Sequence, residues 1–180
     1  MKHLAILALV LMCALVGSAQ QSATVTSTQV RVYFSPDGGC TEAVVETVGK
    51  AKASILVQAY SFTSAPIAKA LVDAHKRGVK VRVILDKSQR SERYSSADFL
   101  HNARVPTSID TKHAIAHNKI MVIDGRTVIT GSFNFTKAAE SSNAENLLVI
   151  DDAALARKYS DNWQVHFEHS QPYTGRVSKQ

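Results

Sequence analysis

Residues 113–150, HAIAHNKIMVIDGRTVITGSFNFTKAAESSNAENLLVI, decide how the centre of this chain folds. Two runs rich in β-branched residues, 119–123 and 127–130, flank Asp124-Gly125-Arg126, and an Asp-Gly pair between apolar runs is a strong hairpin signal. Residues 147–150 are again apolar and predict a third strand. This stretch therefore predicts strands that follow one another closely in the chain.

The segment upstream alternates between strand and helix patterns. Val30, Val32 and Phe34 alternate with polar residues, as in a half-buried strand. The predicted elements then follow in the order helix 41–50, strand 54–60, a helix from 64 to just before Gly78, and strand 79–85. Thr41 is the expected N-cap of the first helix, and Pro66 suits the first turn of the second. A β-α-β-α-β order is typical of an α/β domain with a parallel stretch of sheet.

The remaining elements complete one domain. A polar, basic loop at 86–96 precedes a short helix at 97–103 and a strand at 105–109. Asp151 and Asp152 precede a predicted helix over 153–166, and residues 171–180 read as a polar tail. We expect a single α/β domain over residues 29–170, with a mixed, largely parallel sheet flanked by helices on both faces. No internal repeat is present in the sequence.

The first 19 residues have the three-part pattern of a secretory signal peptide. A short basic start is followed by an unbroken apolar run over 4–16, and Gly17-Ser18-Ala19 supplies small residues for cleavage. The apolar run is too short for a comfortable membrane span. We predict cleavage after Ala19, a polar lead over residues 20–28, and a periplasmic or secreted protein without stable membrane association.

Composition describes a globular chain with a modest positive charge. The 180 residues contain 45% hydrophobic residues, 8 Gly and 4 Pro, which excludes collagen-like and low-complexity classes. Removing the predicted signal takes away one lysine and lowers the formal charge from +6 to +5. A basic balance favours an anionic partner. Cys40 is then the one remaining cysteine, so an intrachain disulfide is impossible, and Cys40 would either bridge two copies or, more simply, pack at a helix start.

Polar side chains with catalytic potential are regularly spaced along the predicted hairpin. Side chains at i and i+2 of a strand share one face, about 7 Å apart, so His117 and Lys119 would point the same way. Ser132 and Asn134 would repeat this arrangement if the chain there is extended. An imidazole, an ammonium and an amide that converge can attack and clamp a phosphodiester. Glu145 would fix the tautomer of His117 through a hydrogen bond to its other ring nitrogen.

Each of these residues also has a structural interpretation. His117 alone would usually be an ordinary surface or core histidine, and Lys119 could simply protect an edge strand. Asp124 sits in a turn that favours Asp for local backbone reasons. We interpret it as structural and expect it to form an ion pair with a cationic side chain. His113 lies four residues before His117, but the segment reads as extended and no acid or Cys has matching spacing. We therefore predict no metal site and no cofactor.

The residues His117, Lys119 and Asp124 match the HxKxxxxD signature of the phospholipase D superfamily, and Gly131-Ser132-x-Asn134 matches its companion GSxN segment. The chain resembles the small bacterial endonucleases of that superfamily from about residue 29 to 167. The resemblance implies a phospholipase D-like fold and His117 as nucleophile. It also implies Lys119 and Asn134 as phosphate ligands, Ser132 as a supporting hydrogen bonder and Glu145 as the partner of His117.

Most members of that superfamily carry two such motifs in one chain, whereas this sequence has one. A single motif supplies a nucleophile but no general acid. Association about a twofold axis would bring two identical motifs together. We therefore predict a homodimer with one composite site, in which the second His117 protonates the leaving oxygen.

The motif sets the reaction but not the substrate. The charge and the basic residues Lys87, Arg90 and Arg93, in a loop after a strand end, favour DNA or RNA with little sequence preference. Tyr94 in that loop could stack on a base. The alternatives are a phospholipase D-type phospholipid hydrolase and a noncatalytic nucleic-acid-binding dimer. An amphipathic helix for membrane contact is not evident after residue 19.

Overall fold

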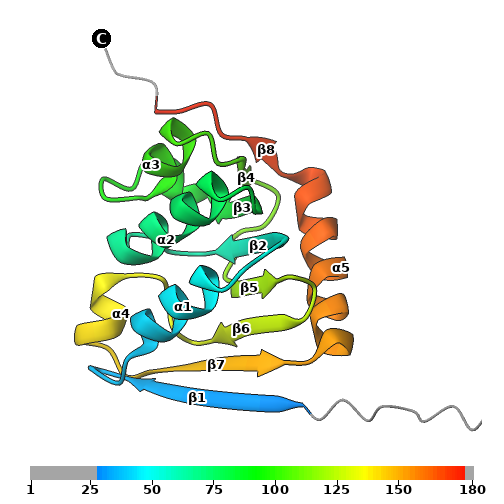
Figure 1. Cartoon of the computed structure of the whole chain (residues 1–180). Helices are drawn as coiled ribbons and strands as arrows, with labels where there is room; N and C mark the ends of the chain where they lie inside the picture. Colours follow the sequence, from blue (N-terminus) through cyan, green and yellow to red (C-terminus); the bar gives the residue numbers. More distant parts are fainter. Residues whose placement is uncertain (1–27, 177–180) are drawn as a thin grey trace, which may run out of the picture.

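The computed structural model describes residues 28–176, which form one α/β domain around an eight-stranded mixed sheet (Figure 1). The strands lie in the order β1-β7-β6-β5-β2-β3-β4-β8. The strand bounds are β1 Gln29–Ser35, β2 Ser54–Ala59, β3 Lys80–Asp86, β4 Thr107–Asp110, β5 Lys119–Ile123, β6 Thr127–Gly131, β7 Glu145–Asp151 and β8 Gln171–Pro172. The α-helices are α1 Cys40–Gly49, α2 Ala65–Lys76, α3 Ala97–Asn102, α4 Lys137–Ser141 and α5 Ala153–His169, and a 3-10 turn covers Lys87–Arg90.

The predicted mixed sheet is confirmed, although its parallel part is smaller than expected. Among the strand pairs of this sheet, only β2 with β3 and β3 with β4 are parallel. The predicted hairpin of β5 and β6 is antiparallel, β7 extends it, and β1 returns to pair antiparallel with β7. The short turn over residues 124–126 leaves no room for the crossover that parallel pairing of β5 with β6 would need. With β1, β7 and β8 also antiparallel to their partners, the sheet is not largely parallel.

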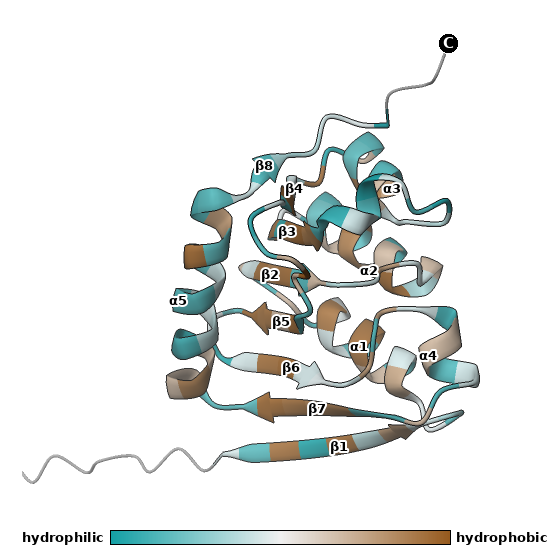
Figure 2. Ribbon diagram, turned by 180° about the vertical axis from the view of Figure 1, so that it is seen from behind, coloured by the Kyte–Doolittle hydropathy of each residue, from teal (hydrophilic) through white to brown (hydrophobic). Residues whose placement is uncertain are grey.

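Helices cover both faces of the sheet, as predicted. Val83 and Leu85 of β3 and Met121 of β5 pack into the larger core, together with α1, α2 and α3. Ile84 and Ile120 point to the opposite face, where they pack in a second core with Trp163 of α5. Figure 2 shows the apolar residues concentrated in the central strands β2, β3 and β5, between these helices. Period-two alternation in the central strands thus supplies two cores from one sheet.

The start of α1 differs from the prediction. The helix begins at Cys40, and its N-cap residue is Gly39, in the left-handed region, so Thr41 is not the cap. The carboxylate of Glu140 in α4 accepts hydrogen bonds from the backbone N–H groups of Gly39 and Thr41 instead. A side chain distant in sequence satisfies these donors, which sequence patterns do not reveal.

Cys40 is fully buried in the first turn of α1. Burial and the nearby Glu140 carboxylate raise the pKa of its thiol to about 11. A buried, protonated thiol is a poor partner for a disulfide between two copies. The packing interpretation of Cys40 is therefore the correct one.

The C-terminal boundary extends beyond the prediction. α5 is capped by Asp152, whose carboxylate accepts from the N–H groups of Ala154 and Leu155, and it continues to His169. Residues predicted as a polar tail then form β8, which pairs with β4. Tyr173 is buried and donates a hydrogen bond to Asp98. The domain thus includes residues beyond 170. The sequence did not predict this extension, because a polar strand of two residues has no recognisable pattern.

The predicted signal peptide at 1–19 and nearly all of the polar lead at 20–28 lie outside the described residues. Between residues 28 and 176, no helix has the length and apolarity needed to cross a bilayer.

Candidate active site

A pocket of about 450 Å³ collects the motif residues at the ends of three strands. It is lined by His117, two residues before β5, and by Lys119 at the start of that strand. The other lining residues are Gly131 at the end of β6, Ser132 and Asn134 beyond that end, and Glu145 at the start of β7. A larger hollow of about 900 Å³ between α1, α2 and α4 contains none of these residues. The sequence-predicted catalytic residues thus converge in one place, although they come from three separate segments.

Lys119 is the most enclosed charged group of the pocket, with 8% of its surface exposed. Its Nζ donates to the carbonyl oxygen of His117 at 2.8 Å. Desolvation lowers the pKa of Lys119 below its ordinary value, and the nearby Glu145 carboxylate opposes this shift. Because few groups solvate this ammonium, it is ready to bind an incoming anion.

His117 is exposed at the mouth of the pocket, and its ring packs against Tyr60. The two ring centroids lie 4.6 Å apart, and Lys119 Nζ lies 5.3 Å from the Tyr60 ring centroid. Tyr60 follows directly after β2, and its backbone N–H donates to Asn118. Sequence reasoning missed Tyr60, because only the pairing of β2 with β5 brings it beside the motif.

The turn after β6 depends on Gly131. Its φ is 144°, and a Cβ there would lie 2.2 Å from the carbonyl oxygen of Asn146. That carbonyl accepts from the N–H groups of Ser132 and Phe133, while the Ser132 hydroxyl accepts from the N–H of Asn146. The glycine permits this close approach, and Ser132 fixes the start of β7, where Glu145 stands. The chain leaves strand geometry after Gly131, so Ser132 and Asn134 do not continue β6 as an extended pair.

Asn134 carries a buried side-chain oxygen, Oδ1, that has no hydrogen-bond partner among the described residues. Its neighbours Phe133 and Phe135 are both buried in the larger core and hold the backbone on either side. An amide beside a cationic lysine in a pocket is a suitable ligand for phosphate oxygens through its NH₂ group.

Glu145 lines the pocket without the expected contact to His117. Its Oε1 accepts from Asn143 Nδ2 at 3.1 Å, and no hydrogen bond to the His117 ring is formed within residues 28–176. The role of Glu145 as the partner of His117 stays a prediction.

Asp124 makes contacts of a structural kind, and its partners are backbone amides instead of the expected cation. Its carboxylate accepts three hydrogen bonds, from the N–H groups of Lys52, Ala53 and Ser54, at 2.7–2.9 Å. Desolvation would raise the pKa of Asp124, but these three hydrogen bonds outweigh it and lower the pKa. The seven-residue spacing from His117 thus places Asp124 at the far end of β5, where it anchors the start of β2.

The predicted substrate loop does not line the pocket. Lys87 Nζ donates to the carbonyl of His113, Arg90 donates to Gln171, and the Arg93 guanidinium lies 5.7 Å from the ring centroid of Tyr94. All three basic side chains belong to exposed residues. Their contribution to substrate binding stays a prediction.

His113 lies in a group of potential metal ligands, contrary to the prediction from the sequence. His113 is not paired with His117; it lies beside Asp110, His166 and His169 in a cluster separate from the pocket. An acid does have matching spacing, since Asp110 stands three residues before His113. The two histidines of α5 could not be assigned from sequence because they are more than fifty residues away.

The pocket thus presents an exposed imidazole, a poorly solvated ammonium and a free amide around one small space. These groups are suited to nucleophilic attack on a phosphodiester and to stabilising charge on its non-bridging oxygens.

Comparison with known proteins agrees with this chemistry. Residues 44–168 match the family described as "Cardiolipin synthase, PLD-like domain". A phospholipase D of Rickettsia conorii is 45% identical over 135 residues, covering 75% of this chain and 68% of that protein. A mitochondrial cardiolipin hydrolase of Xenopus laevis is 33% identical over 138 residues, covering 77% of this chain and 65% of that protein.

One solved structure has the same fold, and the match covers the whole length of that solved chain. The phospholipase D family member Nuc from Salmonella typhimurium has a TM-score of 0.79 and 39% identity, and the match covers 84% of this chain and 100% of Nuc. The family match, the identities and the pocket agree: this chain belongs to the phospholipase D superfamily and is a phosphodiester hydrolase.

Proposed function

We propose that the chain is a metal-independent endonuclease of low sequence specificity, acting on DNA and also on RNA through a phosphohistidine intermediate at a homodimer interface. The observation that carries this proposal is the convergence of His117, Lys119 and Asn134 in one pocket that holds a single motif histidine. "Metal-independent" refers to the chemical steps, for which Lys119 and Asn134 of both copies supply the stabilising groups.

The reaction needs two histidines in opposite protonation states. One neutral His117 attacks phosphorus and forms an N–P bond, while the P–O bond to the leaving group breaks and that oxygen takes a proton from the second, protonated His117. Water then attacks phosphorus, gives a proton to the second imidazole and breaks the N–P bond. Two displacements retain configuration at phosphorus, and the pH–rate profile is bell-shaped.

The dimer is inferred from the incomplete site and is supported by apolar side chains near it. Phe34, opposite Asn146 in the pairing of β1 with β7, is 65% exposed. Ile115, two residues before His117, is 57% exposed. Large apolar side chains exposed on segments that lead into a half-site suit an isologous contact. Phe34→Glu and Ile115→Glu should therefore raise the monomer fraction in sedimentation experiments.

Nucleic acid is favoured as the substrate by the charge and by the basic loop. Tyr94 is 71% exposed, with Arg93 against its ring, which is the arrangement of a stacking platform for an unpaired base. Phosphate contacts through Lys87, Arg90 and Arg93 would be independent of sequence and weakened by salt. Substituting all three with Gln should therefore reduce cleavage most strongly at low salt, where these contacts contribute most.

Phospholipid hydrolysis is the second candidate, because relatives are named phospholipase D and mitochondrial cardiolipin hydrolase. A noncatalytic nucleic-acid-binding dimer is the third, but the presence of His117, Lys119 and Asn134 in one pocket favours catalysis.

One experiment separates the three functions. The mature protein and His117→Ala are each incubated with plasmid DNA, RNA and phosphatidylcholine vesicles. Nucleic-acid cleavage that His117→Ala abolishes supports the proposal. Release of choline alone would assign the lipid activity, and binding of DNA without any cleavage would assign the noncatalytic role.

We further propose that the protein is exported and cleaved after Ala19. A mass measurement of the protein recovered from the periplasm or medium tests this, and an intact N-terminus at Met1 would contradict it.

A further inference from the structure

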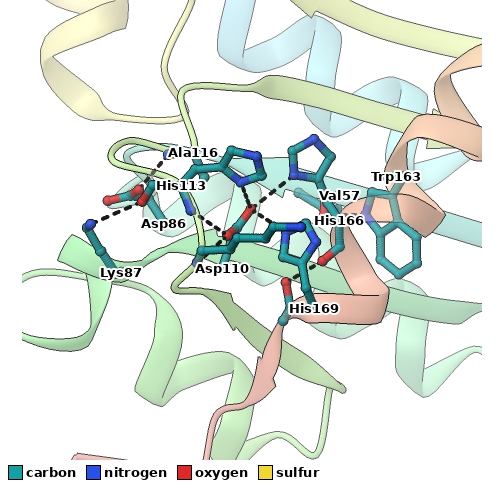
Figure 3. Close-up of polar contacts among 11 residues, drawn as sticks. Val57, Asp86, Lys87, Asp110, His113, Ala116, Trp163, His166 and His169 are labelled. Atoms are coloured by element: carbon teal, nitrogen blue, oxygen red, sulfur yellow. Dashed lines mark hydrogen bonds and ion pairs between the residues drawn. The ribbon is translucent and has the colours of Figure 1, made fainter.

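Three imidazoles and one carboxylate converge at the end of β4, in a cluster outside the catalytic pocket (Figure 3). Asp110 Oδ2 lies 2.9 Å from His113 Nδ1, 3.0 Å from His166 Nδ1 and 3.3 Å from His169 Nε2. The four potential ligand atoms all lie within 4.8 Å of one another. We call Asp110, His113, His166 and His169 the Asp–His cluster.

Hydrogen bonds alone do not explain this cluster well, because too many donors would converge on the Asp110 carboxylate. Asp110 Oδ1 already accepts from the backbone N–H groups of Lys112 and His113. Oδ2 would then have to accept from three imidazoles, although a carboxylate oxygen offers about two acceptor positions. A cation at the point of convergence would instead use one lone pair from each of the four atoms.

The three distances from Asp110 Oδ2 are close to those between the ligand atoms of a tetrahedral metal centre. Metal–ligand bonds of about 2.0–2.1 Å in a tetrahedron separate the ligand atoms by about 3.3 Å. The three distances from Asp110 Oδ2 span 2.9–3.3 Å, so small side-chain rotations would accommodate an ion. Three imidazole nitrogens with one carboxylate oxygen suit a borderline-soft divalent transition metal better than Mg²⁺ or Ca²⁺, which prefer oxygen ligands.

We propose that the Asp–His cluster binds one divalent transition-metal ion of the zinc class, in a structural site. Four protein ligands leave no coordination position for a substrate or a reactive water, which is typical of structural sites. The cluster shares no residue with the pocket of His117. This proposal does not depend on the proposed nuclease function.

The ligands join segments that are distant in sequence. Asp110 ends β4 and His113 stands in the following turn, whereas His166 and His169 lie one turn apart at the end of α5. Residues at i and i+3 of a helix share one face, so both can bind the same ion. The ion would therefore fix the C-terminal end of α5 to the sheet immediately before β8.

Burial favours retention of an ion while leaving a route of entry. The Asp110 side chain is fully buried and those of His166 and His169 are 14% and 18% exposed, whereas that of His113 is 41% exposed. Exchange with solvent would therefore pass the His113 side of the cluster.

The Asp–His cluster also stands at the start of the loop that carries the nucleophile. Lys87 Nζ donates to the carbonyl of His113, and Asp86 Oδ2 accepts from the N–H of Ala116, the residue before His117 (Figure 3). A metal on His113 would restrain the beginning of this loop, while Asp86 holds its end. The cluster is thus a positioning and stabilising element and not part of the reaction.

The test measures metal content and stability on tag-free mature protein. Wild-type protein, His166→Ala and His169→Gln are equilibrated with Zn²⁺, desalted and analysed by inductively coupled plasma mass spectrometry. His75→Gln, which alters a half-buried histidine outside the cluster, is the control. We expect about one Zn²⁺ per chain in wild type and control, and an affinity at least about 100-fold weaker in both cluster variants.

Thermal melting of the wild-type protein provides a second test that does not depend on the folding of any variant. Removing the ion from wild-type protein with a chelator should lower the melting temperature by about 8–16 °C, and Zn²⁺ should restore it. Co²⁺ in place of Zn²⁺ should give the visible absorption of a tetrahedral site. Wild-type protein that retains no metal after desalting, and melts at one temperature with and without Zn²⁺, would overturn the proposal.

Discussion

The catalytic pocket and the Asp–His cluster are built in opposite ways. The pocket takes its motif residues from one stretch of fewer than thirty residues, and its histidine is exposed at the mouth. The cluster takes its ligands from segments more than fifty residues apart, and its carboxylate is fully buried. The pocket lacks a second histidine, whereas the cluster contains a full set of ligands. In the two proposals, the pocket therefore needs a second copy of the chain to act, whereas the cluster stabilises a single copy.

The sharpest separation of the two regions comes from His117→Ala. Removing the nucleophile should lower kcat by about 10⁴-fold or more. The melting temperature should stay within about 1 °C, because the exposed ring contributes little burial. Nuclease assays and melting curves measure both, with His75→Ala as the control. A variant with more than a tenth of wild-type activity would remove His117 from the mechanism.

Lys119→Met should have the next largest effect and should change activity and stability in opposite directions. Loss of the ammonium should lower kcat about 10²–10³-fold, as loss of one transition-state donor does. Desolvation lowers the pKa of Lys119, which means that folding disfavours its charged form, so an apolar isostere should raise the melting temperature by about 1–3 °C at neutral pH.

Stability measured at alkaline pH checks the Lys119 prediction. Because the pKa is lowered, the wild-type chain loses this charge at a lower pH than an ordinary lysine does, and the stability difference from Lys119→Met should narrow as the pH rises. Lys80→Met, at an exposed position, is the control. A less stable Lys119→Met protein would show that the charge supports the fold.

Asp124→Ala tests the interpretation of the third motif residue as structural. Three backbone N–H groups would lose their acceptor, which should reduce the free energy of unfolding by about 1–3 kcal/mol, as measured by urea denaturation. The folded-state pKa of Asp124 is lowered, so its contribution is present above the ordinary Asp pKa of about 3.9 and is lost as the pH falls through the lower folded value.

Asp161→Ala, at an exposed carboxylate on α5, is the matched control for this measurement. At 20 °C, kcat of Asp124→Ala should remain within about threefold of wild type. A large loss of activity without a loss of stability would assign Asp124 to the chemistry.

The smallest expected effect is that of chelation on the chemical step. Well below the melting temperature, EDTA should change kcat by about twofold or less, although it lowers the melting temperature through the Asp–His cluster. Loss of activity under these conditions, restored by a divalent ion, would contradict the metal-independent mechanism. Measuring stability in the same samples separates this outcome from simple unfolding.

The difference between the two regions also explains what the sequence could predict. The hairpin of β5 and β6, the helices on both faces and the convergence of His117, Lys119 and Asn134 follow from local periodicity and one compact motif. Tyr60 and the α5 histidines meet their partners only through strand pairing and helix packing. Glu140 as the cap of α1 and the two-residue strand β8 are likewise decided by tertiary contacts that leave no local pattern.

The mixed dimer tests the composite site most directly. A dimer purified with two different tags contains one wild-type chain and one His117→Ala chain, and its rate is compared with that of the wild-type dimer at equal dimer concentration. The composite site predicts less than about 1% of the wild-type rate, because each dimer has either a nucleophile or a general acid but not both. A mixed dimer that retains half of the wild-type rate would show that each chain acts alone and would contradict the account.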